Sequence, residues 1–138
     1  MRNRAKQALS AVCCTLAASL PLGLATTASA EEKEPVAGKA SYYEISGVGA
    51  CGDQIDPTTE PLVAAPASLW TTPNPNEDPL CAQSIKVTYD GTTITVPIKD
   101  KCPSCDGSHI DLGRAAFEQL ADTSLGVIDV EWEIVDGQ

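Results

Sequence analysis

The segment Ser84–Ile98 is the part of the chain that most restricts its fold. Apolar and polar residues alternate on both sides of Asp90-Gly91, and this dipeptide is typical of two-residue hairpin turns. A turn there places Val87 opposite Ile94, so the apolar residues of both strands share one face. The pattern and the turn agree, and together they predict two antiparallel strands that cover a core.

Two aspartates, a cysteine pair and the only histidine of the chain follow this hairpin within a few residues. Asp100 has the same parity as the apolar residues of the second strand, so we expect it in line with the buried face. Cys102 and Cys105 could form a disulfide, a redox pair or half of a zinc site with His109. The disulfide is favoured over the redox pair and the zinc site, because the signal peptide described below predicts that the protein is exported. Asp111 follows His109 by two residues.

The remaining segments predict a small, mostly β domain. They are a strand at Gly38–Ile45, a glycine-rich loop at Gly47–Gly52, a short strand with a helical turn at Leu62–Trp70, an irregular loop at Thr71–Pro79, a helix at Arg114–Ala121 and a strand at Val127–Val135. Many short strands and one short helix favour a closed or nearly closed barrel.

Residues 1–30 have the features of a secretory signal peptide. Basic residues at the start precede an apolar run, and Ala28-Ser29-Ala30 forms a small-x-small cleavage site. The alternative is a membrane anchor, which Pro21 and Gly23 within the apolar run disfavour. We therefore expect a secreted protein with no membrane association, a flexible segment at residues 31–37 and a folded domain at residues 38–138.

Four of the six cysteines remain after the leader. An even number of cysteines in a small exported domain is typical of disulfides, and four allow three pairings. We favour Cys51–Cys81 with Cys102–Cys105, because the second pair lies too close in sequence to avoid contact easily.

The mature chain is strongly acidic. The leader holds three of the nine basic residues and none of the nineteen acidic ones, so six basic residues remain and the net charge is −13. Such a protein is repelled by phosphate backbones, which argues against nucleic-acid binding. Its 108 residues suit one domain, expected to be a monomer, and no further domain is expected after Val135.

The order of four motifs in the mature chain resembles the double-psi β-barrel family, which includes expansin domain 1, barwin and RlpA-like proteins. The motifs are Gly38–Tyr43 with Gly49–Gly52, Ile98–Cys105, His109–Leu112 followed by Ala115–Phe117, and Gly126–Val135. The resemblance implies a single six-stranded double-psi β-barrel with one or two short helices. Function is a separate question, because one fold supports several activities.

The resemblance also implies a groove lined by Asp100 and Asp111, with Ser41, Tyr43 and His109 as neighbours. The alternative for the aspartates is structural: Asp100 would accept backbone N–H bonds at a barrel crossover, and Asp111 would help to cap the following helix. Structure or ligand binding is favoured over catalysis, and no metal or cofactor is expected.

The secreted, acidic, four-cysteine character is similar to that of bacterial inhibitors of papain. This similarity implies a non-enzymatic protein that occludes the cleft of papain-like cysteine proteases. Candidate contacts are the loop residues Ser46, Gly47, Val48, Gly49 and Ala50, together with Trp70. Glycine-containing apolar loops allow close backbone approach, although many are only tight turns. Trp70 could instead be a lid over one end of the barrel.

Two other hypotheses concern the groove. One is an expansin-like module that binds or loosens cell-wall polysaccharide, and the other is a peptidoglycan lytic transglycosylase that uses a single acid. The sequence departs from the family at two places: Gly113-Arg114 replaces the usual Ser-Pro, and Cys102 replaces an aromatic residue near the first groove aspartate. The second change weakens a platform for sugar stacking.

Overall fold

The computed structural model describes residues 34–137. The predicted signal peptide and the first three residues of the predicted flexible segment therefore lie outside the described residues. The first strand begins at Val36, two residues before the predicted start of the domain. No helix within residues 34–137 is long and apolar enough to cross a membrane.

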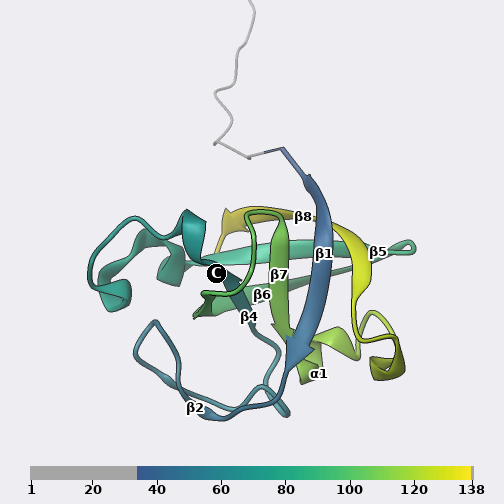
Figure 1. Cartoon of the computed structure of the whole chain (residues 1–138), viewed down its shortest axis with the longest axis horizontal. Coiled ribbons are helices and arrows are strands. Elements are labelled where there is room, and N and C mark those ends of the chain that lie inside the picture. Colours follow the sequence, from purple (N-terminus) through teal and green to yellow (C-terminus); the bar gives the residue numbers. More distant parts are fainter. Residues whose placement is uncertain (1–33, 138) are drawn as a thin grey trace, which may run out of the picture.

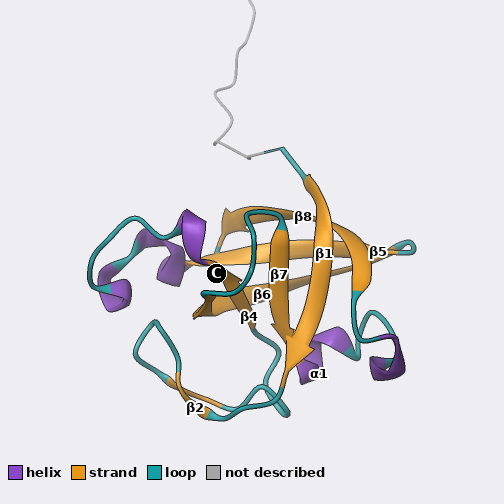
Figure 2. Cartoon of the chain, viewed as in Figure 1, coloured by secondary structure: helices purple, strands orange, loops and turns teal. Residues whose placement is uncertain are grey.

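Six strands form a closed barrel in the order β1-β7-β4-β6-β5-β8, which confirms the predicted fold class (Figures 1 and 2). These strands are β1 (Val36–Tyr43), β4 (Val63–Pro66), β5 (Gln83–Tyr89), β6 (Thr92–Cys102), β7 (His109–Gly113) and β8 (Ile128–Asp136). The pairs β1/β7 and β4/β6 are parallel, and the other neighbours are antiparallel. A separate two-stranded sheet joins β2 (Gly47–Val48) to β3 (Gln54–Ile55).

The helical segments are short. They are the α-helix α1 (Arg114–Phe117) and the 3₁₀ turns η1 (Ala67–Leu69), η2 (Pro75–Glu77), η3 (Pro79–Ala82) and η4 (Thr123–Leu125). The helix predicted at Arg114–Ala121 is thus half its predicted length, and the chain continues in tighter turns up to Ala121. Phe117 is still fully buried, and its ring lies 4.9 Å from that of Tyr42.

The predicted hairpin is confirmed. Val87 pairs with Ile94, and the two turn residues Asp90 and Gly91 have φ angles of 46° and 85°. Positive φ at both positions is the geometry that this dipeptide favours. The inner residues of the hairpin and of β8 fill the core, and Trp132 is 3% exposed, as its parity predicted.

Gly38 is expected to be indispensable for the contact between β1 and the loop before β7. A Cβ added at Gly38 would overlap the Ser108 carbonyl oxygen, which accepts hydrogen bonds from Lys39 N and from Trp132 Nε1. We expect Gly38→Ala to lower the free energy of unfolding by about 1–3 kcal/mol, because backbone must move to admit the methyl group. Denaturant unfolding measures the change.

Gly107→Ala is the matched control. A Cβ there would meet its nearest atom, Ser68 Oγ, at 3.5 Å, which is ordinary van der Waals contact. Equal midpoints for Gly38→Ala, Gly107→Ala and the wild-type protein would contradict the steric argument.

Candidate functional site

Four strands bring two aspartates and a serine into one row on the barrel. Ser41 of β1 pairs with Asp111 of β7, and Ala64 of β4 pairs with both Asp111 and Asp100 of β6. Neighbouring strands lie about 4.8 Å apart, so the two aspartate Cα atoms are separated by about 10 Å across β4. Ala64 lies between them and is 3% exposed.

The expectation that Asp100 lies in line with the buried face was wrong. Val63 pairs with Ile98, but the next residue, Ala64, pairs with Asp100, so the register shifts by one residue at Lys99. Such a β-bulge reverses the alternation of side chains beyond it. Asp100 therefore faces the same side as Ala64 and Asp111, whereas the parity of the strand alone placed it inside.

One end of the row is a chain of hydrogen bonds. The Ser41 hydroxyl donates to Asp111 Oδ1 at 2.8 Å, and the Ser41 oxygen lies 2.8 Å from His109 Nε2. Because the hydroxyl proton is given to Asp111, the Ser41 oxygen accepts from an Nε2–H of His109. Burial raises the pKa of the Asp111 carboxyl above its ordinary value, although the Ser41 hydrogen bond and His109 act in the opposite direction.

The other end of the row is organised by Asp100. This carboxylate accepts hydrogen bonds from the Ala50 and Lys101 backbone N–H groups, both at 2.9 Å, and from the Tyr43 hydroxyl at 3.1 Å. Burial, followed by the nearby Asp100 charge, raises the pKa of Tyr43 well above its ordinary value. Asp100 thus holds the backbone of the glycine-rich loop, in agreement with the structural alternative for this residue.

The structural alternative for Asp111 does not hold. The N-cap position of α1 is Gly113, and no side chain caps this helix. Asp111 instead accepts a hydrogen bond from the Ser41 hydroxyl.

The row does not form a serine nucleophile. In a catalytic triad the imidazole accepts the serine proton, whereas here the carboxylate of Asp111 accepts it and His109 lies behind the serine. Within residues 34–137 no group of three or more His, Cys, Asp or Glu side chains is arranged to hold a metal ion. The row presents hydroxyl, imidazole and carboxylate groups, which are suited to hydrogen bonding with a polar ligand.

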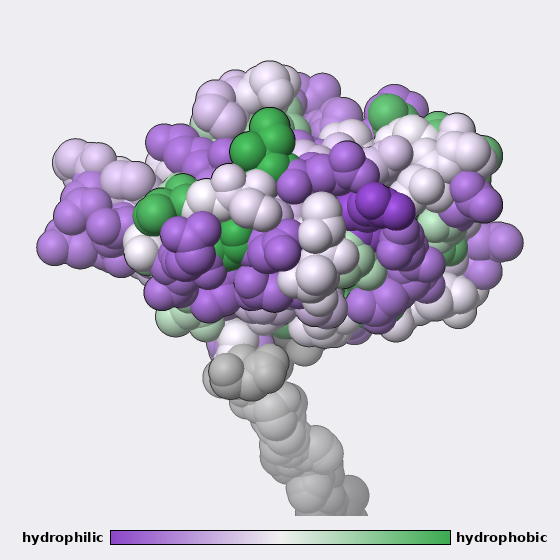
Figure 3. All heavy atoms as spheres, turned by 90° about the horizontal axis from the view of Figure 1, so that it is seen from below, coloured by the Kyte–Doolittle hydropathy of each residue, from purple (hydrophilic) through white to green (hydrophobic). Residues whose placement is uncertain are grey.

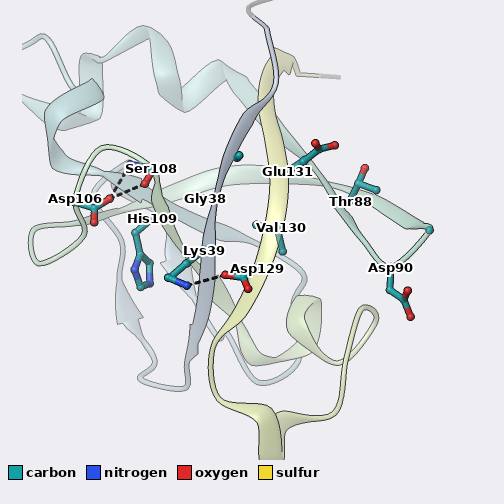
Figure 4. A pocket seen from close by; sticks show the side chains of 12 residues that line it. Gly38, Lys39, Thr88, Asp90, Asp106, Ser108, His109, Asp129, Val130 and Glu131 are labelled. Atoms are coloured by element: carbon teal, nitrogen blue, oxygen red, sulfur yellow. Dashed lines mark hydrogen bonds and ion pairs between the residues drawn. The ribbon is translucent and has the colours of Figure 1, made fainter.

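A pocket of about 710 Å³ adjoins the row (Figure 4). It lies over β1, β8 and the tip of the β5–β6 hairpin, and its ionisable lining residues are Lys39, Asp90, Asp106, His109, Asp129 and Glu131. Lys39 pairs with Asp129 at 2.7 Å. Of the residues in the row and its hydrogen-bonded neighbours, only His109 lines this pocket, so the pocket and the row are adjacent surfaces.

The glycine-rich loop divides into an exposed part and an anchored part. Val48 is 71% exposed, and Ile45, which is not among the predicted contacts, is 80% exposed. Gly49 is buried against the Lys99 carbonyl, where a Cβ would overlap it, and the Ala50 N–H is held by Asp100. Of the candidate contacts in this loop, Ser46 and Val48 are exposed, Gly47 and Ala50 are partly exposed, and Gly49 is buried.

The anchored part is also covalently fixed. The structure joins Cys51 to Cys81 and Cys102 to Cys105, the pairing favoured from the sequence. The first disulfide ties the glycine-rich loop to η3, and Asn76 of η2 packs against Gly52. Figure 1 shows the β2 loop and the η1–η3 segment extending from the same end of the barrel.

Trp70 is partly buried at this end of the barrel. Its Nε1 donates to the Ala65 carbonyl at 3.2 Å, and its ring packs against the core cluster. The Lys101 ammonium lies 5.9 Å from the ring centroid. Only part of the ring is available to a partner, which favours the lid role over that of a contact.

Apolar residues do not form a continuous patch on the side of the molecule that carries the β2 loop. Figure 3 shows this side, where green spots are small and separated by hydrophilic atoms. Among residues 34–137, the large apolar residues that are most exposed are Ile45, Val48, Leu125 and Val127.

Comparisons with known proteins agree on the fold. A double-psi β-barrel family model described as lytic transglycolase matches residues 35–132. The structure of the expansin of Clavibacter michiganensis superposes with a TM-score of 0.64 at 24% identity, over 76% of this chain and 52% of that chain. At this identity the expansin likeness shows the fold alone.

Two further matches extend over nearly the whole of the matched protein. The papain inhibitor of Streptomyces mobaraensis is 47% identical over 138 residues, which cover 96% of this chain and 96% of that protein. The solved structure of the Streptomyces papain inhibitor superposes with a TM-score of 0.74 at 52% identity, over 75% of this chain and 96% of that chain.

Proposed function

This chain belongs to the double-psi β-barrel family, and we propose that within it the chain is a secreted, non-enzymatic inhibitor of papain-like cysteine proteases. The observation that carries the proposal is the 47% identity to the papain inhibitor over 96% of both proteins. A likeness of this extent includes the loops as well as the barrel, and loops are where binding residues concentrate. The two disulfides and the leader sequence support export.

The inhibitor acts by occlusion of the protease cleft. A cysteine protease attacks its substrate with a thiolate that lies in this cleft. The exposed part of the glycine-rich loop is held from behind by Asp100 and by Cys51–Cys81. A loop that is already ordered loses little conformational entropy on binding, so more of the contact free energy appears as affinity.

The proposed contacts are Ser46, Gly47 and Val48. They precede the anchored residues Gly49 and Ala50, which position the loop and contribute less direct contact. Trp70 directly follows η1, in the segment that extends from the same end of the barrel as the β2 loop (Figure 1). It acts mainly as a lid, and the exposed part of its ring is only a secondary contact.

Titration of papain with the purified mature protein tests the proposal. We expect peptide hydrolysis to fall in proportion to the added protein and to reach zero near one molecule of inhibitor per active site, because one cleft is blocked by one loop. Full papain activity at micromolar concentrations of the protein would remove the proposal.

A second candidate function, binding of neutral polysaccharide, rests on the row of Ser41, Asp111 and Asp100. These groups lie on one outward face of four adjacent strands and present acceptors and donors to hydroxyl groups. Sedimentation with cellulose or chitin that is lost in Asp111→Ala would support this function. Release of anhydro-muropeptides from peptidoglycan that depends on Asp111 would instead show the lytic transglycosylase reaction.

A further inference from the structure

We infer that Val48 is the anchor side chain of the inhibitor and that it enters an apolar subsite of a protease whose cleft has a cationic rim. The inference rests on the proposed function and adds to it the chemistry of the partner. Three features of the glycine-rich loop carry it: an exposed apolar side chain, a rigid support and a one-sided charge.

The first feature is the exposure of Val48. Val48 is 71% exposed although it belongs to strand β2, which pairs with β3. Gly47 precedes it, and apart from the two chain neighbours of Gly47, no atom of residues 34–137 lies within 4 Å of where a Cβ at Gly47 would be. Another backbone can therefore approach the strand beside Val48, as an extended segment does when it pairs with a strand edge.

The second feature is the support behind Val48. Gly49 N donates to Asp53 O at 2.9 Å, and Cys51 N donates to Lys99 O at 3.3 Å. Gly49 packs directly on the Lys99 carbonyl at the bulge of β6. The Val48 side chain thus projects from backbone that is fixed to the barrel. Because little conformational entropy is lost when such a side chain binds, a single residue can contribute much of the binding free energy of an interface.

The third feature is charge. Residues 44–60 contain four carboxylates, Glu44, Asp53, Asp56 and Glu60, and no lysine or arginine. Glu44 pairs with Arg114 and Asp53 pairs with Lys99, both at 3.1 Å, whereas Asp56 and Glu60 have no ion pair within the described residues. We call these four carboxylates the collar. They outnumber their two basic partners, Lys99 and Arg114, so the loop carries a net negative charge. This charge favours a partner with basic groups beside an apolar subsite and disfavours one with acidic groups there.

The experiment measures the inhibition constant and the association rate constant toward papain. Val48→Asp is expected to raise the inhibition constant at least about tenfold, whereas Val48→Leu retains inhibition because it keeps an apolar anchor. Leu125→Asp is the matched control, since this exposed apolar residue ends η4 at another loop. Circular dichroism on each variant establishes that the barrel is folded.

Charge is tested with two double variants of equal charge change. Glu44→Gln with Glu60→Gln removes two charges from the collar, and Asp90→Asn with Glu131→Gln removes two from the surface around the tip of the β5–β6 hairpin, away from the β2 loop (Figures 1 and 4). We expect the collar variant to slow association about threefold more than its control at low ionic strength, and the difference to shrink as salt is added.

The outcomes separate the inference from the proposed function. Failure of the wild-type protein to inhibit papain overturns the proposed function and, with it, the inference. Inhibition by the wild type with equal constants for Val48→Asp and Leu125→Asp overturns the anchor alone. Equal rates for the two double variants overturn the cationic rim.

Discussion

Replacement of Asp78 by alanine is expected to lower the free energy of unfolding by about 3 kcal/mol. Asp78 is 4% exposed. Its carboxylate accepts from the backbone N–H groups of Thr71, Thr72 and Leu80 and from the Thr72 hydroxyl, at 2.8–3.0 Å. Alanine leaves these donors without their partner, and the loop that they close loses its organising group.

The contribution of Asp78 depends on pH. Burial raises the pKa of this carboxyl, but the N–H groups of Leu80, Thr72 and Thr71 outweigh burial and lower the pKa to about 2. A group whose pKa is lower in the folded state stabilises the protein above its unfolded pKa and loses this effect as the pH falls through its folded value. The stability difference between the wild type and Asp78→Ala is therefore full above about pH 4 and shrinks toward pH 2.

Asp122→Ala is the matched control for Asp78→Ala. Asp122 also begins a 3₁₀ turn and accepts from Ser124 N at 2.8 Å, but it is exposed and accepts from fewer groups. We expect a loss of about 0.5–1 kcal/mol for this variant. Denaturant unfolding at neutral and acidic pH decides the matter, and equal losses for both variants, or a loss at Asp78 that does not change with pH, would contradict the assigned role.

The second large effect is expected from Cys51→Ser with Cys81→Ser. These cysteines are 30 residues apart, and a disulfide over this separation stabilises by about 3–4 kcal/mol in the chain-entropy model. The same change frees the glycine-rich loop from η3, so we also expect weaker papain inhibition at temperatures where the variant remains folded. Unfolding curves measure the loss of stability, and inhibition constants determined on the same preparation measure the loss of inhibition.

Cys102→Ser with Cys105→Ser provides the comparison. These residues are three apart, so the model predicts a smaller loss of about 2 kcal/mol, and the β2 loop keeps its covalent link. The reverse order of the two losses, or unchanged inhibition after removal of Cys51–Cys81, would contradict the role given to this disulfide. Free thiols at all four cysteines in the purified protein would contradict both.

Local patterns were sufficient to predict much of the barrel. The dipeptide Asp90-Gly91 determines the register of β5 and β6, and the observed pairing is the predicted one. The alternation in Val127–Val135 likewise predicted the inner face of β8, which includes Trp132. These predictions depend on residues near one another in sequence, where the period of a strand and the geometry of a turn act directly.

The incorrect predictions concern places where segments that are distant in the sequence meet in the fold. The orientation of Asp100 depends on the bulge at Lys99, which forms where β6 changes its pairing with β4. No feature of Ile94–Lys99 by itself indicates that change. The short length of α1 has a similar origin, because the chain after Phe117 leaves the helix to reach η4 and β8.

The row of Ser41, Asp111 and Asp100 likewise could not be predicted from local patterns alone. Ser41 and Asp111 are 70 residues apart, and only the parallel pairing of β1 with β7 places them together. The family resemblance supplied this neighbourhood. The Asp-Pro-Leu sequence at Asp78–Leu80 was a readable signal for a capped turn, but the further donors from Thr71 and Thr72 become visible only in the folded loop.

Intact-mass analysis after prolonged incubation with papain is the most direct test of whether the fixed loop blocks the protease without being cleaved. We expect one species that retains both disulfides and an uncut chain from Glu44 to Gly52, while the papain remains inactive. Cleavage within this stretch, with recovery of papain activity as the cut product accumulates, would show that the loop is a substrate and would contradict the account.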